Sequence, residues 1–171
     1  VLEREIMNHL FPDTTYGCES GGDPKNIPDL TYENFLNFHR TYYHPSNSYI
    51  YLYGNMDMEE KLAFLDEHYL SHFDYLDVDS VIQEQKAFGA CRDVTLEYPV
   101  AENEGEEDNT YLSYNMVVGN AADSQMAMAF EVLDYALLSA PGAPLKQALL
   151  DVKAGKDVYG SYDDGILQPY F

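Results

Sequence analysis

The sequence predicts an α+β fold, with mixed or antiparallel sheets and helices packed on one face. Two kinds of pattern alternate along the chain: apolar residues at helical spacing, and short runs rich in aromatic and β-branched residues. The composition favours a folded chain, because 46% of its 171 residues are hydrophobic and 14% are aromatic. A chain of this length is long enough to bury a core.

Three helices are predicted in the first half of the chain. The first is amphipathic over residues 2–10 and ends at Phe11, because Pro12 disfavours helix in the residue before it. Thr31 is predicted to cap the second helix, whose apolar face carries two phenylalanines. Asp57, followed three residues later by a glutamate, is predicted to open the third.

Strands and further helices are predicted after the second helix. Short aromatic and branched runs predict strands over residues 49–54, 93–98, 110–118 and 157–162. Apolar residues at i, i+4, i+7 and i+11 predict an amphipathic helix over residues 126–137. A break at Pro141 separates it from a short helix over residues 145–152.

The charge excludes some classes of partner. Nine basic and 30 acidic residues leave a formal net charge of −21, and no cluster of Lys or Arg occurs. Nucleic acid and anionic membranes both reward such clusters, so neither is expected as a partner. Residues 99–109 hold five acids without a base and predict an exposed loop.

Cysteine usage bears on the compartment. The chain has two cysteines, which are too few for a disulfide scaffold and have no CxxC spacing. We therefore expect a reducing compartment, either the cytoplasm or, in a eukaryote, an organelle matrix. One disulfide remains an alternative. The chain begins with Val1 in a helical pattern, and we interpret it as a piece of a longer protein.

Two stretches have a spacing that metal sites use. His68 and His72 are four residues apart on the third predicted helix, and Asp74, Asp77 and Asp79 resemble a calcium loop. Neither stretch is complete: no HExxH or HxxEH motif is present, and the acidic run lacks the glycine and glutamate of an EF-hand. An acidic metal-binding module is an alternative, but we predict no metal ligand and no catalytic residue in this chain.

Ordered sequence motifs resemble those of a known family. They are Leu10-Phe-Pro-Asp-Thr-Thr-Tyr-Gly17, Ser20-Gly-Gly-Asp-Pro24, Tyr43-His-Pro-Ser-Asn47, the segment Leu133–Leu145 and Asp157-Val-Tyr-Gly160. In this order they resemble the insulinase-type (inverzincin, pitrilysin-like) zinc metallopeptidases, and within them the presequence-protease-like branch. The resemblance covers essentially the whole chain.

The resemblance implies a parent protein that is a zinc-dependent metalloendopeptidase, a hydrolase that degrades short unstructured peptides in an enclosed chamber. In this family, zinc is held by the two histidines of HxxEH and a downstream glutamate, and all three would lie outside this chain. This chain alone is then expected to be inactive. An inactive family member that serves as a scaffold or binding subunit is the alternative.

The resemblance also implies parts of two domains. Residues 1–76 would be the C-terminal part of the zinc domain, 77–92 a linker, and 93–171 the N-terminal part of a second domain without zinc. The expected partners are peptide substrates and the remaining domains of the parent chain.

Two segments are the candidate sites. The resemblance implies a backbone that pairs with a peptide by β-augmentation, and the residues are Val158, Tyr159, Gly160 and Ser161. A glycine-rich loop is expected to shape the chamber wall, and its residues are Ser20, Gly21, Gly22 and Asp23. In the insulin-degrading relative a carboxylate in the loop equivalent to Ser139–Leu145 meets the peptide amine, whereas the matching Ser139-Ala140-Pro141 has no carboxylate.

Overall fold

The structure is a computed structural model that describes residues 1–103, 105, 107 and 109–171. The chain divides into two compact units. Unit 1 combines residues 1–20 with residues 82–171, and unit 2 consists of residues 21–81. Three acids of the predicted exposed loop, Glu104, Glu106 and Asp108, lie outside the described residues. The division into a zinc-domain piece, a linker and a second-domain piece stays a prediction.

The predicted α+β fold with sheets is wrong for the described residues. They form helices, and their only β-type pairings are two isolated bridges, Val117 with Tyr170 and Asp163 with Tyr170. The segments predicted as strands have the composition of strands, but a strand exists only when its backbone bonds to a partner. The runs 93–98 and 110–118 are separated by eleven residues, and a connection of that length does not fix a pairing register as a two-residue turn does.

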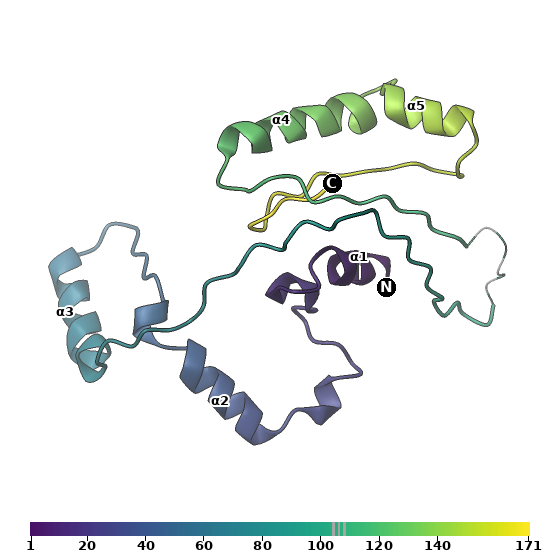
Figure 1. The fold of residues 1–171 in the computed structure, drawn as a ribbon. Helices are drawn as coiled ribbons and strands as arrows, with labels where there is room; N and C mark the ends of the chain where they lie inside the picture. The colour runs from purple at the N-terminus through teal and green to yellow at the C-terminus, as the bar shows by residue number, and fades with distance from the viewer. Residues whose placement is uncertain (104, 106, 108) are drawn as a thin grey trace. The chain divides into compact units, whose positions relative to one another are not determined.

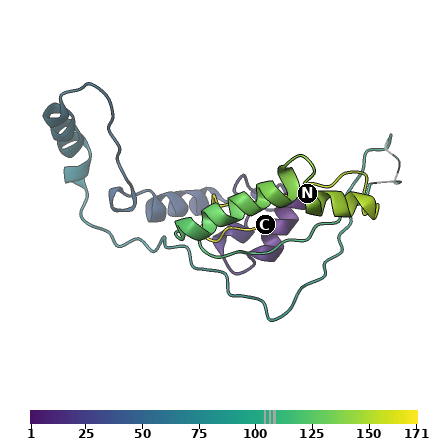
Figure 2. The same ribbon diagram turned by 90° about the horizontal axis from the view of Figure 1, so that it is seen from above.

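The helices of unit 1 lie where the periodicity predicts them. They are α1 (Leu2–Leu10), α4 (Ser124–Asp134), the π-helical turn η5 (Tyr135–Ser139) and α5 (Pro144–Asp151), with a 3₁₀ turn η1 (Thr15–Gly17). In Figures 1 and 2, α4 and α5 follow one another in a row, and the yellow C-terminal segment passes close to both. Two ring and side-chain contacts fix that approach, Phe130 with Tyr162 and Leu138 with Gly160.

A small aromatic core holds the N-terminal segment of unit 1 to the C-terminal one. Phe11 is 0% exposed. Its ring meets the ring of Tyr16 edge-on at 5.8 Å and that of Tyr170 at 6.3 Å. Pro169 is also fully buried. Burial of a large apolar ring is the strongest stabilising contribution available to so small a core.

A buried amide links the same segments by hydrogen bonds. Gln85 is 6% exposed. Its Oε1 accepts from Asp13 N at 2.9 Å, and its Nε2 donates to Asp13 Oδ2 at 2.7 Å. The backbone N of Gln85 donates to Gln168 Oε1 at 2.5 Å, while Gln168 Nε2 donates back to Gln85 O at 3.2 Å. Gln85 therefore joins three segments of unit 1 that are far apart in sequence.

Unit 2 is built from capped helices and 3₁₀ turns. Its elements are η2 (Ile27–Asp29), α2 (Tyr32–Tyr42), η3 (Pro45–Asn47), α3 (Met58–His68) and η4 (Leu70–His72). The caps predicted from the sequence are confirmed: Thr31 Oγ1 accepts from Asn34 N at 3.1 Å, and Asp57 Oδ1 accepts from Glu60 N at 3.0 Å. In unit 2, all of which the structure describes, no residue is buried.

Asn47 connects the end of α2 to a distant segment of unit 2. Its Nδ2 donates to Tyr42 O at 2.9 Å, and its Oδ1 accepts from Ser80 Oγ at 2.6 Å. Next to it, Ser46 Oγ accepts from Leu76 N at 3.1 Å. The His-Pro-Ser-Asn motif thus acts as a hydrogen-bonded junction. Across the described residues of both units, no helix has the length and apolar character needed to cross a bilayer.

Candidate functional site

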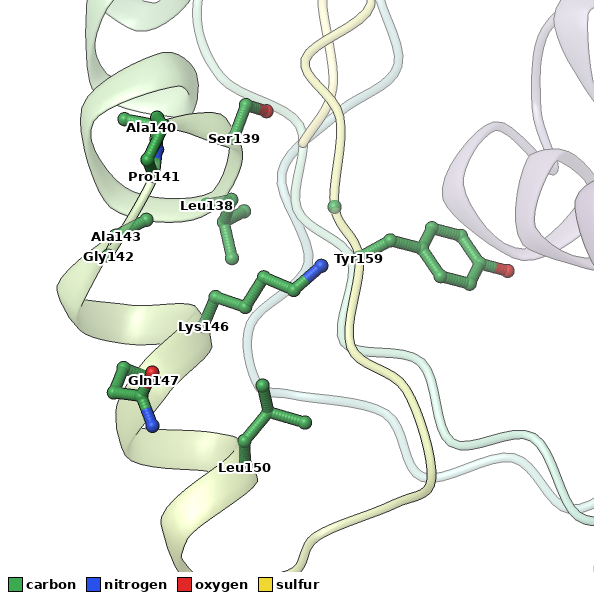
Figure 3. A pocket seen from close by; sticks show the side chains of 11 residues that line it. Leu138, Ser139, Ala140, Pro141, Gly142, Ala143, Lys146, Gln147, Leu150 and Tyr159 are labelled. Carbon is green, nitrogen blue, oxygen red and sulfur yellow. The ribbon is translucent and has the colours of Figure 1, made fainter.

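A hollow of about 490 Å³ opens in unit 1 between the end of η5 with α5 on one side and the extended segment that follows α5 on the other. Figure 3 shows the helical side chains beside the segment that carries Tyr159, whose ring points away from α5. The helical side supplies residues 138–143 with Lys146, Gln147 and Leu150, and the extended side supplies Tyr159 and Gly160. A volume of this size fits a peptide side chain with its flanking backbone.

The local sequence explains the curved helical wall. In η5 the backbone N of Ala140 donates to Tyr135 O at 2.7 Å, an i→i+5 bond that widens the last turn. Gly142 follows with φ +74°, a backbone conformation that residues other than glycine rarely adopt. Pro144 then begins α5, where its missing N–H costs no helical bond.

A glycine allows the extended segment to approach that wall. A Cβ at Gly160 would clash with Leu138 Cδ1. Two residues later the ring of Tyr162 stacks on Phe130, with centroids 5.5 Å apart and an interplanar angle of 20°. The segment is therefore held beside the helices at two points, and its backbone lies at the edge of the hollow.

The backbone of that segment has no protein partner in the described part of the chain. Among the described residues, no hydrogen bond involves the N–H or C=O of Tyr159, Gly160 or Ser161. Val158 N donates to Asp157 Oδ1 at 2.8 Å. Unpaired, extended backbone beside a hollow is the arrangement that a peptide strand uses for β-augmentation.

Lys146 carries the only charge among the described residues that line the hollow. Its side chain is 38% exposed, and its Nζ lies 3.7 Å from Asp157 Oδ1, on a side chain that is 77% exposed. An ion pair this long and this solvated contributes little stability. Figure 3 shows the ammonium extending from α5 toward the segment that carries Tyr159.

Two polar atoms behind the wall are buried without a hydrogen-bond partner in the described structure: Asp134 Oδ1 and the Tyr162 hydroxyl. Burial raises the pKa of Tyr162, and the carboxylates of Asp164 and Glu131 raise it further. Asp134 does not line the hollow; its Oδ2 lies 3.4 Å from Ser139 Oγ, which does. The wall is consequently neutral on its inner face apart from Lys146.

The residues predicted for peptide binding fall at this site in part. Tyr159 and Gly160 line the hollow, and Val158 and Ser161 flank them along the chain. Sequence reasoning missed Lys146. The signal that could have found it is the position of Lys146 in the first turn of a helix opened by Pro144, directly after the loop at residues 139–143.

The glycine-rich loop forms a tight turn. Ser20 belongs to unit 1, whereas Gly21, Gly22 and Asp23 belong to unit 2. Gly22 has φ +84°, and a Cβ there would lie 3.1 Å from Ile27 Cδ1. Asp23 accepts at Oδ1 from Lys25 N at 2.9 Å. Glycine is therefore required at position 22 for backbone reasons alone.

The two histidines that the sequence spacing places on one helix belong to different elements of the structure. α3 ends at His68, and His72 lies in the 3₁₀ turn η4. The ring of His68 packs against Phe64 at 4.5 Å. Among the described residues, no group of three or more His, Cys, Asp or Glu is placed to hold a metal ion. Cys18 and Cys91 are exposed free thiols.

Comparisons with known proteins agree with the resemblance. The family described as Peptidase M16 inactive domain matches residues 29–171. The chain is 47% identical over 171 residues to "Protein HypA" of Clostridium perfringens, covering all of this chain and 18% of that protein. It is 37% identical over 175 residues to "Presequence protease 1, chloroplastic/mitochondrial" of Arabidopsis thaliana, covering all of this chain and 16% of that protein.

A third relative, "Presequence protease, mitochondrial" of Xenopus laevis, is 34% identical over 158 residues, covering 92% of this chain and 15% of that protein. The chain thus spans less than a fifth of each of these relatives. These matches confirm the resemblance to an insulinase-type, presequence-protease-like peptidase fragment.

Proposed function

Because this chain belongs to the Peptidase M16 inactive-domain family, we propose that it is the non-catalytic segment of a zinc-dependent metalloendopeptidase that degrades short unstructured peptides in an enclosed chamber. Relatives that carry the name presequence protease support the proposal. The described residues do not fit a zinc site, since no group of three or more His, Cys, Asp or Glu among them is placed to hold a metal ion. The zinc would be held elsewhere in the parent protein.

The role of this segment is to hold substrate. One observation carries this part of the proposal: the unpaired extended backbone of Tyr159–Ser161 lies along a hollow of about 490 Å³. A peptide that adds a strand there gains backbone hydrogen bonds, which are independent of its sequence, and alternate side chains enter the hollow. That suits substrates that are unstructured and varied.

A glycine substitution tests the peptide site. In the full-length protein that contains this chain, Gly160→Ala should weaken binding of a fluorescent extended peptide about ten-fold or more, because the new Cβ displaces Leu138 or the segment itself. The metal is removed by a chelator so that the peptide is not cut. Gly89→Ala is the matched control, because a Cβ at position 89 meets nothing within 4 Å. Equal binding by the two variants would refute the peptide site.

The activity itself is tested by zinc. The full-length protein should cleave a short fluorogenic peptide, lose cleavage in chelator and regain it with added zinc. Peptide binding without cleavage in the zinc-loaded protein would instead favour the scaffold or binding-subunit alternative. Calorimetric titration with zinc and calcium tests the acidic metal-binding alternative, for which the described residues offer no cluster.

The glycine-rich loop Ser20–Asp23 is proposed to shape the chamber wall. Gly21→Val tests this more cleanly than a change at Gly22, whose φ of +84° would be strained by any side chain. We expect lower peptidase turnover with unchanged thermal unfolding. Unchanged turnover at unchanged stability would remove the loop from the proposal.

The compartment is proposed from the thiols and the relatives. Two exposed free cysteines suit a reducing environment, such as a cytoplasm or an organelle matrix. The names of two relatives place those proteins in mitochondria or chloroplasts. Peptides and the remaining domains of the parent chain are the proposed partners.

A further inference from the structure

The charge inside the hollow has the opposite sign to that of the chain. The chain carries a net −21, which at long range attracts basic peptides. Yet among the described lining residues the single charged side chain is the ammonium of Lys146. At physiological ionic strength, salt largely screens exposed charges that are more than about 8 Å apart. The selectivity of a contact therefore depends on the charged group at the contact itself.

We propose that Lys146 makes the hollow a subsite for a carboxylate, which binds an Asp or Glu side chain, or the terminal carboxylate, of a peptide extended along Tyr159–Ser161. This inference rests on the proposed peptide site and adds the chemical class that the site selects. It also explains the lack of a carboxylate at Ser139-Ala140-Pro141: the site is built to receive an acid rather than an amine.

The surroundings of Lys146 favour an incoming anion. Leu138, Ala143 and Leu150 contribute apolar surface to the same hollow, and an apolar wall strengthens an ion pair formed against it. Lys146 lies in the first turn of α5, which has no side-chain cap and no acidic residue in that turn. The positive end of the helix dipole therefore adds to the field of the ammonium.

The present partner of Lys146 is easily exchanged. Asp157 Oδ1 lies 3.7 Å from Nζ, beyond hydrogen-bond distance, and the same oxygen already accepts from Val158 N at 2.8 Å. Asp157 is also largely exposed. A peptide carboxylate that reaches Nζ at hydrogen-bond distance replaces a long, solvated contact with a charge-assisted bond.

The experiment compares blocked peptides that differ at one residue. Three acetylated and amidated extended peptides carry Glu, Gln or Lys at the same central position, and a fourth has the Gln residue and a free C-terminal carboxylate. Fluorescence anisotropy measures their binding to the full-length, chelator-treated protein. We expect the Glu peptide to bind about three- to ten-fold more tightly than the Gln peptide. High salt should reduce that ratio.

Variants assign the preference to Lys146. Lys146→Met keeps an apolar stem of similar length and should bring the Glu-to-Gln ratio to one without weakening the Gln peptide. Lys146→Glu should favour the Lys peptide. Lys153→Met removes the same charge from an exposed position that does not line the hollow, and it should keep the Glu preference.

The outcomes separate this inference from the proposed function. If no peptide binds saturably, or if Gly160→Ala has no effect, the peptide site itself fails. If all four peptides, including the one with a free C-terminal carboxylate, bind equally and Gly160→Ala weakens them all, the peptide site stands and the carboxylate subsite is overturned. A preference for the Lys peptide in the unmodified protein would also overturn it, and would point to Asp134 behind the wall. Tighter binding of the free-carboxylate peptide alone would restrict the subsite to chain termini.

Discussion

Different interactions stabilise unit 1 and unit 2, each within itself. Unit 1 buries a small set of side chains, with Phe11 at 0% exposure and Leu138 and Ala143 near the hollow. Unit 2 buries none of its residues, although it is rich in aromatic side chains. Phe35 on α2, for example, is 68% exposed. Unit 2 depends instead on helix caps and on the hydrogen bonds of Asn47.

This difference teaches that apolar patterning and burial are separate properties. The apolar residues of α1 and of α2 follow the same helical spacing, yet only α1 leads into a residue that is fully enclosed. Aromatic area stabilises a fold only when it is removed from water. Unit 1 should therefore resist local opening, and unit 2 should open readily.

The largest effect that would sharpen this comparison is at the aromatic core. Phe11→Ala should lower the local unfolding free energy of unit 1 by about 3–5 kcal/mol, because it leaves a cavity between Tyr16 and Tyr170. Amide hydrogen exchange on the full-length protein measures it unit by unit. Phe35→Ala is the matched control and should change unit 2 by less than about 0.5 kcal/mol. Equal effects would erase the distinction between the units.

A smaller loss is expected at the buried amide. Gln85→Leu removes the acceptor for Asp13 N and the donor for Asp13 Oδ2, and leaves those groups unpaired where Gln85 was buried. The expected cost is about 1–3 kcal/mol in unit 1, read by the same exchange measurement. Gln125→Leu, on an exposed position of α4, should have almost no effect. An unchanged unfolding free energy in Gln85→Leu would show that water replaces the hydrogen bonds of Gln85 at no cost.

The junction of unit 2 should respond more weakly. Asn47→Ala removes the bonds to Tyr42 O and Ser80 Oγ, which are exposed, so we expect a cost of about 1 kcal/mol. Exchange at residues 73–81 should quicken while unit 1 is unchanged. Asn55→Ala, also exposed and in the same unit, is the control. Faster amide exchange throughout unit 1 would contradict the expectation that the effect of Asn47→Ala stays within unit 2.

The smallest effect is a pH dependence in unit 1. Burial raises the pKa of Tyr170 above its ordinary value of 10.0, and the neighbouring Asp163 carboxylate raises it further. The folded state therefore holds the phenolic proton more tightly than the unfolded state. Its contribution to stability is complete below about pH 10 and falls as pH rises through the folded pKa.

Tyr170→Phe should reduce this alkaline loss, and thermal unfolding from neutral to alkaline pH measures it. Part of the loss should remain, because burial also raises the pKa of Tyr162. At neutral pH the variant loses the hydrogen bond to Asp163 Oδ2 at 3.2 Å, a cost below about 1 kcal/mol. If stability falls with rising pH as steeply in Tyr170→Phe as in the unmodified protein, Tyr170 does not cause the alkaline loss.

Of the residues that line the hollow, the sequence proposed only those of the extended segment for peptide binding, and that role stays a prediction. The motif at residues 157–160 pointed to Tyr159 and Gly160, which line the hollow. Lys146 was missed because its place in the first turn after Pro144 marks it only as a candidate, and that local pattern does not show that its side chain faces a segment thirteen residues further on. The His68 and His72 pair failed as helical neighbours because α3 ends at His68, before the second ring can lie on the same helix.

Local chemistry by itself determined the helices, their caps and the family. Capping and helical periodicity act within three or four residues, so Thr31, Asp57 and the stop before Pro12 could be read directly. Only the tertiary structure decided which apolar faces are buried, that the strand-like runs among the described residues form isolated bridges and no sheet, and that Lys146 lines the hollow. Burial and strand pairing depend on contacts between residues far apart in sequence, and no local pattern specifies them.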